Sequence, residues 1–149
     1  MSTNRELFFR YQKEGIPNSV IFFALEQVNG FTHTQLAMNF DLKTKNYATF
    51  CRAMERYLKG EMIEYVFNKS YFLNRPFYID KHVLIPRQET EQLVVLSLEK
   101  IKQKFGDKKL KVADICTGSG AIGISVALAQ TDYIIYLSEI DHKAIKVAD

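Results

Sequence analysis

The feature that most constrains the fold is a glycine-rich stretch between two apolar runs. The sequence DICTGSGAIG, from Asp114 to Gly123, follows the β-prone run LKVADI (110–115) and opens the apolar stretch AIGISVALAQ (121–130). A second apolar run, YIIYLSEI (133–140), comes next. A strand, a tight loop, a helix and a strand in this order predict a βαβ unit, whose crossover makes the two strands parallel. We expect both strands to be buried.

The glycine loop has the properties of a ligand-binding loop. Gly118 and Gly120 tolerate positive φ angles and let a ligand approach the backbone where no Cβ intrudes. The free amides that open the following helix favour anionic or electron-rich groups. Glu139 follows Gly120 by 19 residues, at the spacing where a carboxylate accepts hydrogen bonds from both hydroxyls of an adenosine ribose. With Gly123 the loop also matches G-x-G-x-x-G, which by itself fits a nicotinamide or flavin enzyme as well, or a turn without any ligand.

Asp114 separates the two cofactor interpretations. A carboxylate just ahead of the glycines would repel a pyrophosphate at close range. S-adenosylmethionine has no phosphate and carries a sulfonium and an ammonium group, which nearby carboxylates attract. The sequence therefore favours S-adenosylmethionine as the cofactor.

The first 70 residues predict a small helical domain. Apolar residues recur there at helical spacing, and the gaps contain helix-ending glycines and Pro17 rather than hairpin signals, which indicates four or five short helices. Thr32 and Gln35 match a capping box. The segment YATFCRAMERYLKG predicts a helix with five apolar residues on one face: Tyr47, Phe50, Met54, Tyr57 and Leu58. At this spacing aromatic residues are more often core than a partner-binding surface, and a bundle of this size is marginally stable alone.

Residues 71–87 predict a linker that contains a β-hairpin. Two β-prone runs, 77–79 and 83–85, flank the turn-like sequence DKH. From residue 88 a long helix is predicted to end at Gly106, with five apolar residues on one face: Leu93, Val94, Leu98, Ile101 and Phe105. The incomplete α/β domain then occupies residues 88–149.

Composition excludes several classes of protein. The formal charge of +3, from 20 basic and 17 acidic residues, is too small to indicate direct nucleic-acid binding, and the lysine-rich stretch 99–111 fits a solvated helix end. Cys51 and Cys116 lie far apart, which suggests neither a disulfide framework nor a metal cluster and fits a reduced, cytoplasmic setting. No apolar run approaches membrane-spanning length, so no membrane partner is expected.

Two motifs together resemble those of a known family. VLIPRQETEQLV (83–94), followed by VADICTGSGAIGISVAL (112–128), resembles the HemK/PrmC methyltransferases, which methylate a glutamine side-chain amide in peptide chain release factors. The resemblance implies a helical N-terminal domain for partner recognition, a hairpin linker, and the first part of a Rossmann-like class I methyltransferase domain. It implies a cytoplasmic enzyme with S-adenosylmethionine as cofactor and a release factor as partner.

The resemblance also carries residue roles. It implies that the donor-binding loop consists of Cys116, Thr117, Gly118, Ser119 and Gly120. Glu139 would be the ribose acid, at a position where aspartate is more usual, and Cys116 stands where the family often has glycine. Four linker residues would frame the active site: Pro86, Arg87, Thr90 and Glu91. An equally good interpretation of Arg87 is that it caps its helix or pairs with Glu91.

The catalytic signature of the family, N-P-P-Y, is absent from this sequence. Its three prolines are Pro17, Pro76 and Pro86, and none is adjacent to another. We therefore expect the 149-residue chain to be inactive in methyl transfer alone, since in-line positioning of donor and acceptor is lost. The unpaired strands also predict self-association. A non-catalytic protein-binding fragment and, less favoured, an NAD(P)-dependent oxidoreductase remain alternatives; charge and the linker motif disfavour a nucleic-acid adenine methyltransferase.

Overall fold

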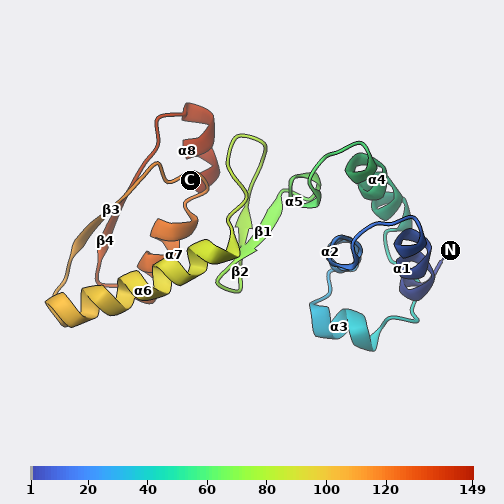
Figure 1. Cartoon of the computed structure of the whole chain (residues 1–149), viewed down its shortest axis with the longest axis horizontal. Helices are drawn as coiled ribbons and strands as arrows, with labels where there is room; N and C mark the ends of the chain where they lie inside the picture. The colour runs from blue at the N-terminus through green and yellow to red at the C-terminus, as the bar shows by residue number, and fades with distance from the viewer. Residues whose placement is uncertain (1) are drawn as a thin grey trace. The chain divides into compact units, whose positions relative to one another are not determined.

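The computed structural model describes residues 2–149. The chain folds into two compact units (Figure 1). The first unit ends at Phe67 and the second spans Asn68–Asp149. Among the described residues the first unit contains five helices, which are α1 (Asn4–Lys13), α2 (Asn18–Asn29), α3 (His33–Met38), α4 (Tyr47–Leu58) and α5 (Ile63–Val66). The helical prediction for this region is confirmed.

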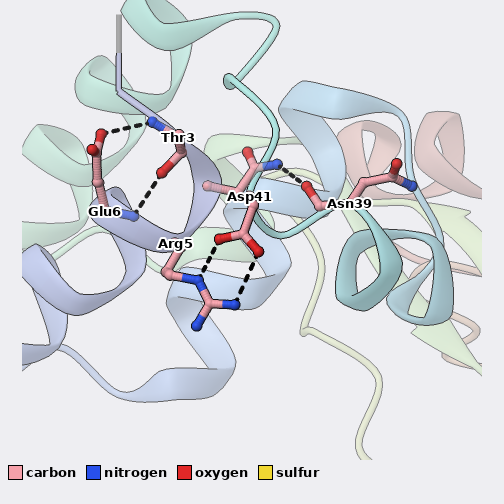
Figure 2. Close-up of polar contacts among 6 residues, drawn as sticks. Thr3, Arg5, Glu6, Asn39 and Asp41 are labelled. Atoms are coloured by element: carbon pink, nitrogen blue, oxygen red, sulfur yellow. Dashed lines mark hydrogen bonds and ion pairs between the residues drawn. The ribbon is translucent and has the colours of Figure 1, made fainter.

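Side-chain caps fix where these helices begin. The predicted capping box of Thr32 and Gln35 is present at α3, and a second one, from Thr3 and Glu6, opens α1. Figure 2 shows the Thr3–Glu6 pair beside the ion pair of Arg5 and Asp41, which ties α1 to the segment after α3. Each box satisfies backbone amides that the first turn of a helix leaves unpaired.

The core of the first unit is apolar and aromatic. Its fully buried side chains include Leu7, Ile21, Leu25, Leu36, Phe50 and Met54. Phe50 and Met54 confirm the predicted inner face of α4, but Leu58 is 58% exposed, so that part of the prediction is wrong. Leu58 is the last residue of α4, where the helix gives way to the exposed Lys59 and Gly60 and no longer packs on the core.

A buried polar network lies within this core. The Asn4 side chain donates to the carbonyl of Asn39 (3.0 Å) and accepts from Asn29 Nδ2 (3.0 Å) and Thr44 Oγ1 (2.7 Å). Asn29 in turn accepts from the Lys45 amide at 3.0 Å. Because Asn4, Asn29 and Thr44 are almost fully buried, their mutual pairing avoids the large penalty of unpaired polar groups.

The second unit begins with a hairpin, but not the predicted one. Strands β1 (Lys69–Phe72) and β2 (Arg75–Tyr78) pair antiparallel around a two-residue turn at Leu73 and Asn74. The predicted second strand, 83–85, is irregular, and of the predicted first strand, 77–79, only Phe77 and Tyr78 belong to a strand, which is β2. The turn has φ angles of 48° and 59°, and the Phe72 and Phe77 rings pack edge to face behind it. Leucine is a poor residue for a left-handed turn, so this turn is not predicted from the sequence.

The predicted parallel βαβ unit is confirmed. Strand β3 (Lys111–Ile115) pairs in parallel with β4 (Ile134–Ser138), and α7 (Ala121–Ala129) connects them and packs on both (Figure 1). The prediction that both strands are buried is wrong, because each alternates between exposed and half-buried residues. One face of the pair packs against α7, and the other faces solvent with Ile115, Ile134 and Tyr136 more than half exposed.

Helices α6 (Gln88–Phe105) and α8 (His142–Ala148) complete the second unit. The predicted long helix is confirmed as α6, but only Val94 of its predicted apolar face is fully buried, whereas Leu93 and Phe105 are exposed. Helix α6 has 18 residues and packs on the 9-residue α7, so its last turns extend beyond what α7 covers. Across residues 2–149 no helix is both long enough and apolar enough to cross a membrane.

Candidate functional site

The glycine loop connects the carboxyl end of β3 to α7. Gly118 and Gly120 have φ angles of 56° and 76°, the left-handed region that favours glycine, and Cys116 adopts 60° without being a glycine. A Cβ at Gly118 would meet no atom within 4 Å, whereas one at Gly120 would lie 2.7 Å from Ile124 Cδ1. Gly118 therefore exposes its backbone to open space, and Gly120 is favoured by its positive φ, with a tight contact to Ile124 in addition.

Asp114 holds the two ends of this loop together. Its Oδ2 accepts from Thr117 Oγ1 at 2.7 Å and from the amide of Gly123, in the first turn of α7, at 2.9 Å. Thr117 is buried and Asp114 is half-buried. The carboxylate thus satisfies a desolvated hydroxyl and an otherwise unpaired helical amide with a single oxygen. Oδ1 has no hydrogen bond within residues 2–149.

Glu139 lies directly after β4 and also contacts the loop. Its Oε2 accepts from the amide of Gly118 at 3.0 Å, and its Oε1 accepts from the amides of Ile140 (2.8 Å) and Asp141 (3.3 Å). These three amides, that of Gly118 first, hold the pKa of the Glu139 carboxyl below its ordinary value because they stabilise the charged form. The sequence did not predict this contact with Gly118.

A pocket of about 240 Å³ brings the loop and the linker motif together. From the predicted site residues it is lined by Pro86, Arg87, Thr90, Cys116, Thr117, Gly118 and Ser119. Five further residues that the sequence did not single out complete its wall, and they are Phe72, Leu84, Ile85, Ala121 and Ile122. Segments about 30 residues apart in the sequence therefore share one cavity, with an arginine and a cysteine among its lining residues.

Glu91 lies outside this pocket and contacts the hairpin. Its Oε1 accepts from the amide of Leu73 in the β1–β2 turn at 2.9 Å, which ties the turn to α6. Arg87 is the N-cap residue of α6 but makes no side-chain capping bond, and within residues 2–149 it forms no ion pair with Glu91. Arg87 therefore occupies the N-cap position through its backbone alone, the ion pair with Glu91 is not present among the described residues, and the residue is exposed.

The remaining predicted residues are near the pocket rather than in its lining. Asp114, Gly120 and Glu139 are absent from the wall, yet Asp114 bonds to Thr117 and Glu139 bonds to Gly118, both of which belong to it. The two carboxylates thus lie at the carboxyl ends of the neighbouring parallel strands β3 and β4. This is the edge of the sheet where α/β proteins bind ligands.

A glycine loop between parallel strands, backed by two carboxylates, is an arrangement that α/β enzymes use to bind nucleoside cofactors, and the known proteins that match the chain include methyltransferases. The chain belongs to the HemK/PrmC family of release factor glutamine methyltransferases. It is 40% identical over 117 residues to the release factor glutamine methyltransferase of Bacillus anthracis, which covers 77% of this chain and 41% of that protein. It is 38% identical over 124 residues to that of Leptospira interrogans, covering 83% and 41%, respectively.

The match is partial in length. The chain spans about two-fifths of the length of the curated relatives it matches. A more distant relative, the release factor glutamine methyltransferase of Mycoplasma mycoides, is 29% identical over 131 residues, which cover 87% of this chain and 45% of that protein. No family model matches the chain.

Proposed function

We propose that this chain carries the donor-binding part of an enzyme that transfers a methyl group from S-adenosylmethionine to a glutamine side-chain amide of a peptide chain release factor. The observation that carries the proposal is the glycine loop with its two carboxylates, Asp114 and Glu139, beside the pocket that the linker motif completes. In this proposal β3, α7 and β4 begin a Rossmann-like class I methyltransferase domain, and residues 1–70 recognise the partner.

The residues present fit this cofactor. S-adenosylmethionine supplies a methyl group on a cationic sulfonium, together with an ammonium, a carboxylate and a ribose. Gly118 offers open backbone, which a side chain at that position would obstruct. Asp114 places negative charge near the loop, which suits a cation and disfavours a pyrophosphate, and Glu139 can accept from the ribose of either cofactor.

Each carboxylate retains a free acceptor for the ligand. Glu139 holds its charged form through backbone amides alone, so its remaining lone pairs can accept from ribose hydroxyls without a change of protonation. Arg87 in the pocket lining offers a guanidinium to the donor's carboxylate, and Pro86 and Thr90 narrow the same cavity. These residues bind and orient; the chain contains no N-P-P-Y sequence to hold the glutamine amide.

Calorimetric titration tests donor binding. We expect the chain to bind S-adenosylmethionine and not NADH. Glu139→Ala should weaken binding about tenfold, which corresponds to the loss of hydrogen bonds to a charged group. Glu99→Ala, which removes an exposed carboxylate from α6, is the matched control and should bind like the parent chain. Binding of NADH, or equal affinity in all three proteins, would contradict the proposal.

Methyl transfer is tested separately. In our proposal the chain binds donor without turning it over, so incubation with radiolabelled S-adenosylmethionine and release factor should leave the release factor unlabelled. Labelling by the isolated chain would refute this part. Binding of release factor without any donor affinity would instead support the non-catalytic alternative. Sedimentation at several concentrations tests the proposed self-association, which a constant monomer mass would exclude.

A further inference from the structure

A second concavity of the second unit lies between α8 and the segment that follows β2. It has a volume of about 570 Å³ and is lined by Tyr78, Asp80, Lys81, His82, Lys143, Lys146 and Val147. None of these residues lines the pocket beside the glycine loop. The two cavities share no lining residue, and the proposed methyltransferase function makes no use of this one.

The lining carries more positive than negative charge, with three lysines against the single carboxylate of Asp80. Lys81, Lys143 and Lys146 are exposed, and within residues 2–149 none of them forms an ion pair. The one carboxylate, Asp80, is already engaged by His82, whose amide donates to Oδ1 at 2.9 Å and whose Nδ1 lies 3.1 Å from it. The three lysines thus line one concavity, where the only carboxylate of the lining, that of Asp80, is bonded to His82 and also interacts with Lys81.

Two elements supply these lysines. Lys143 and Lys146 are three residues apart and share one face of α8, whereas Lys81 lies in the loop after β2. A helix often carries lysines in its last turn simply because they complement its dipole. That explanation fits Lys146 but accounts neither for Lys81 nor for the hollow that the three surround.

We propose that this basic pocket, lined by Lys81, Lys143 and Lys146, binds a small anion that carries two or more phosphate groups. Its volume is within the range of small-molecule sites, whereas an extended nucleic-acid backbone would need a longer basic track. Flexible ammonium groups suit phosphate oxygens. Tyr78, 57% exposed at the rim, offers a ring against which a nucleobase can stack.

The test is calorimetry with two probes, sodium tripolyphosphate and ATP. Both should bind the chain, with affinity that falls as salt rises. The triple variant Lys81→Gln, Lys143→Gln, Lys146→Gln should lose about tenfold or more in affinity. The matched control removes three exposed lysines of α6 instead, Lys100→Gln, Lys102→Gln, Lys104→Gln, and should lose less than about twofold. Equal losses in the two variants, or no binding of either probe, would overturn the proposal.

Further arms identify the source of the phosphate. If Tyr78→Leu weakens ATP and leaves tripolyphosphate unchanged, the ligand is a nucleotide; if neither changes, the phosphate chain alone is recognised, and both results support the pocket. A single-stranded RNA that binds more tightly than both probes and depends on the same lysines would overturn the small-anion proposal. Circular dichroism melting confirms that each variant is folded. S-adenosylmethionine carries no phosphate, so failure of donor binding leaves this test intact.

Discussion

Asp114 is the residue whose replacement most directly tests the architecture of the loop. Asp114→Ala removes the single oxygen that accepts from both Thr117 Oγ1 and the Gly123 amide. We expect the loop and the first turn of α7 to lose their common anchor, and the second unit to lose stability.

The magnitude follows from the two bonds. A hydrogen bond to a charged group contributes about 1.5–3 kcal/mol. Thr117 is only 8% exposed, so its hydroxyl has no water to bond when the carboxylate is removed. Asp114 itself is half-buried, so water can replace part of the lost bond to the Gly123 amide. We therefore expect Asp114→Ala to destabilise the second unit by about 2–4 kcal/mol.

Asp114→Asn separates structure from charge. The asparagine carbonyl can accept both bonds, but as a neutral acceptor it forms weaker ones, so the loss of stability should be about 1–2 kcal/mol and smaller than in Asp114→Ala. Because the negative charge is gone, its affinity for S-adenosylmethionine should nevertheless fall about tenfold. Asp132→Ala, an exposed carboxylate ahead of β4, is the control and should change stability by less than about 0.5 kcal/mol.

Hydrogen exchange of the α7 amides, read by mass spectrometry, measures the local opening free energy without assuming that the two units unfold together. Unchanged protection in Asp114→Ala would refute the anchoring role. If Asp114→Asn opened α7 as much as Asp114→Ala does, charge rather than acceptor geometry would be what holds the loop.

Three further changes test other parts of the structure. Gly123→Ala should destabilise the second unit by about 1–3 kcal/mol in thermal unfolding, because a Cβ there would overlap Leu137 Cδ2; Ser125→Ala on the same helix removes an unpartnered buried hydroxyl and should be neutral or stabilising, and the reverse order would contradict the packing. Asn4→Ala should destabilise the first unit by about 3–5 kcal/mol in urea, since three hydrogen bonds, two of them buried, lose a partner. A loss under about 1 kcal/mol would show that the network contributes little. The pKa of the Glu139 carboxyl in the folded protein is below its ordinary value of 4.5, so its contribution to folding stability is present above pH 4.5 and is lost as pH falls through the folded pKa. Glu139→Gln should therefore reduce the fall of stability with acid pH. An unchanged pH dependence would exclude the contact with Gly118.

Several elements of this chain could be predicted from local pattern alone. Three features depend only on residues close together in the sequence, whose backbone requirements do not change with the rest of the fold. They are the capping box at Thr32, the glycine that ends α2 and the βαβ order around the loop. The hairpin could not be predicted in this way. Two β-prone runs, 77–79 and 83–85, were equally good candidates for hairpin strands. The left-handed turn at Leu73 is stabilised by Glu91, a residue 18 positions away.

The sequence by itself determined the family and the loop. Both can be recognised from residue types at fixed spacing along the chain, namely three glycines, Asp114 and Glu139. Only the tertiary structure decided that Asp114 anchors α7, that Glu139 bonds to Gly118, and that Arg87 shares a pocket with the loop. The physical reason is that hydrogen bonds and cavities depend on the distance between side chains in space. Strand pairing and helix packing set those distances, and spacing along the chain does not.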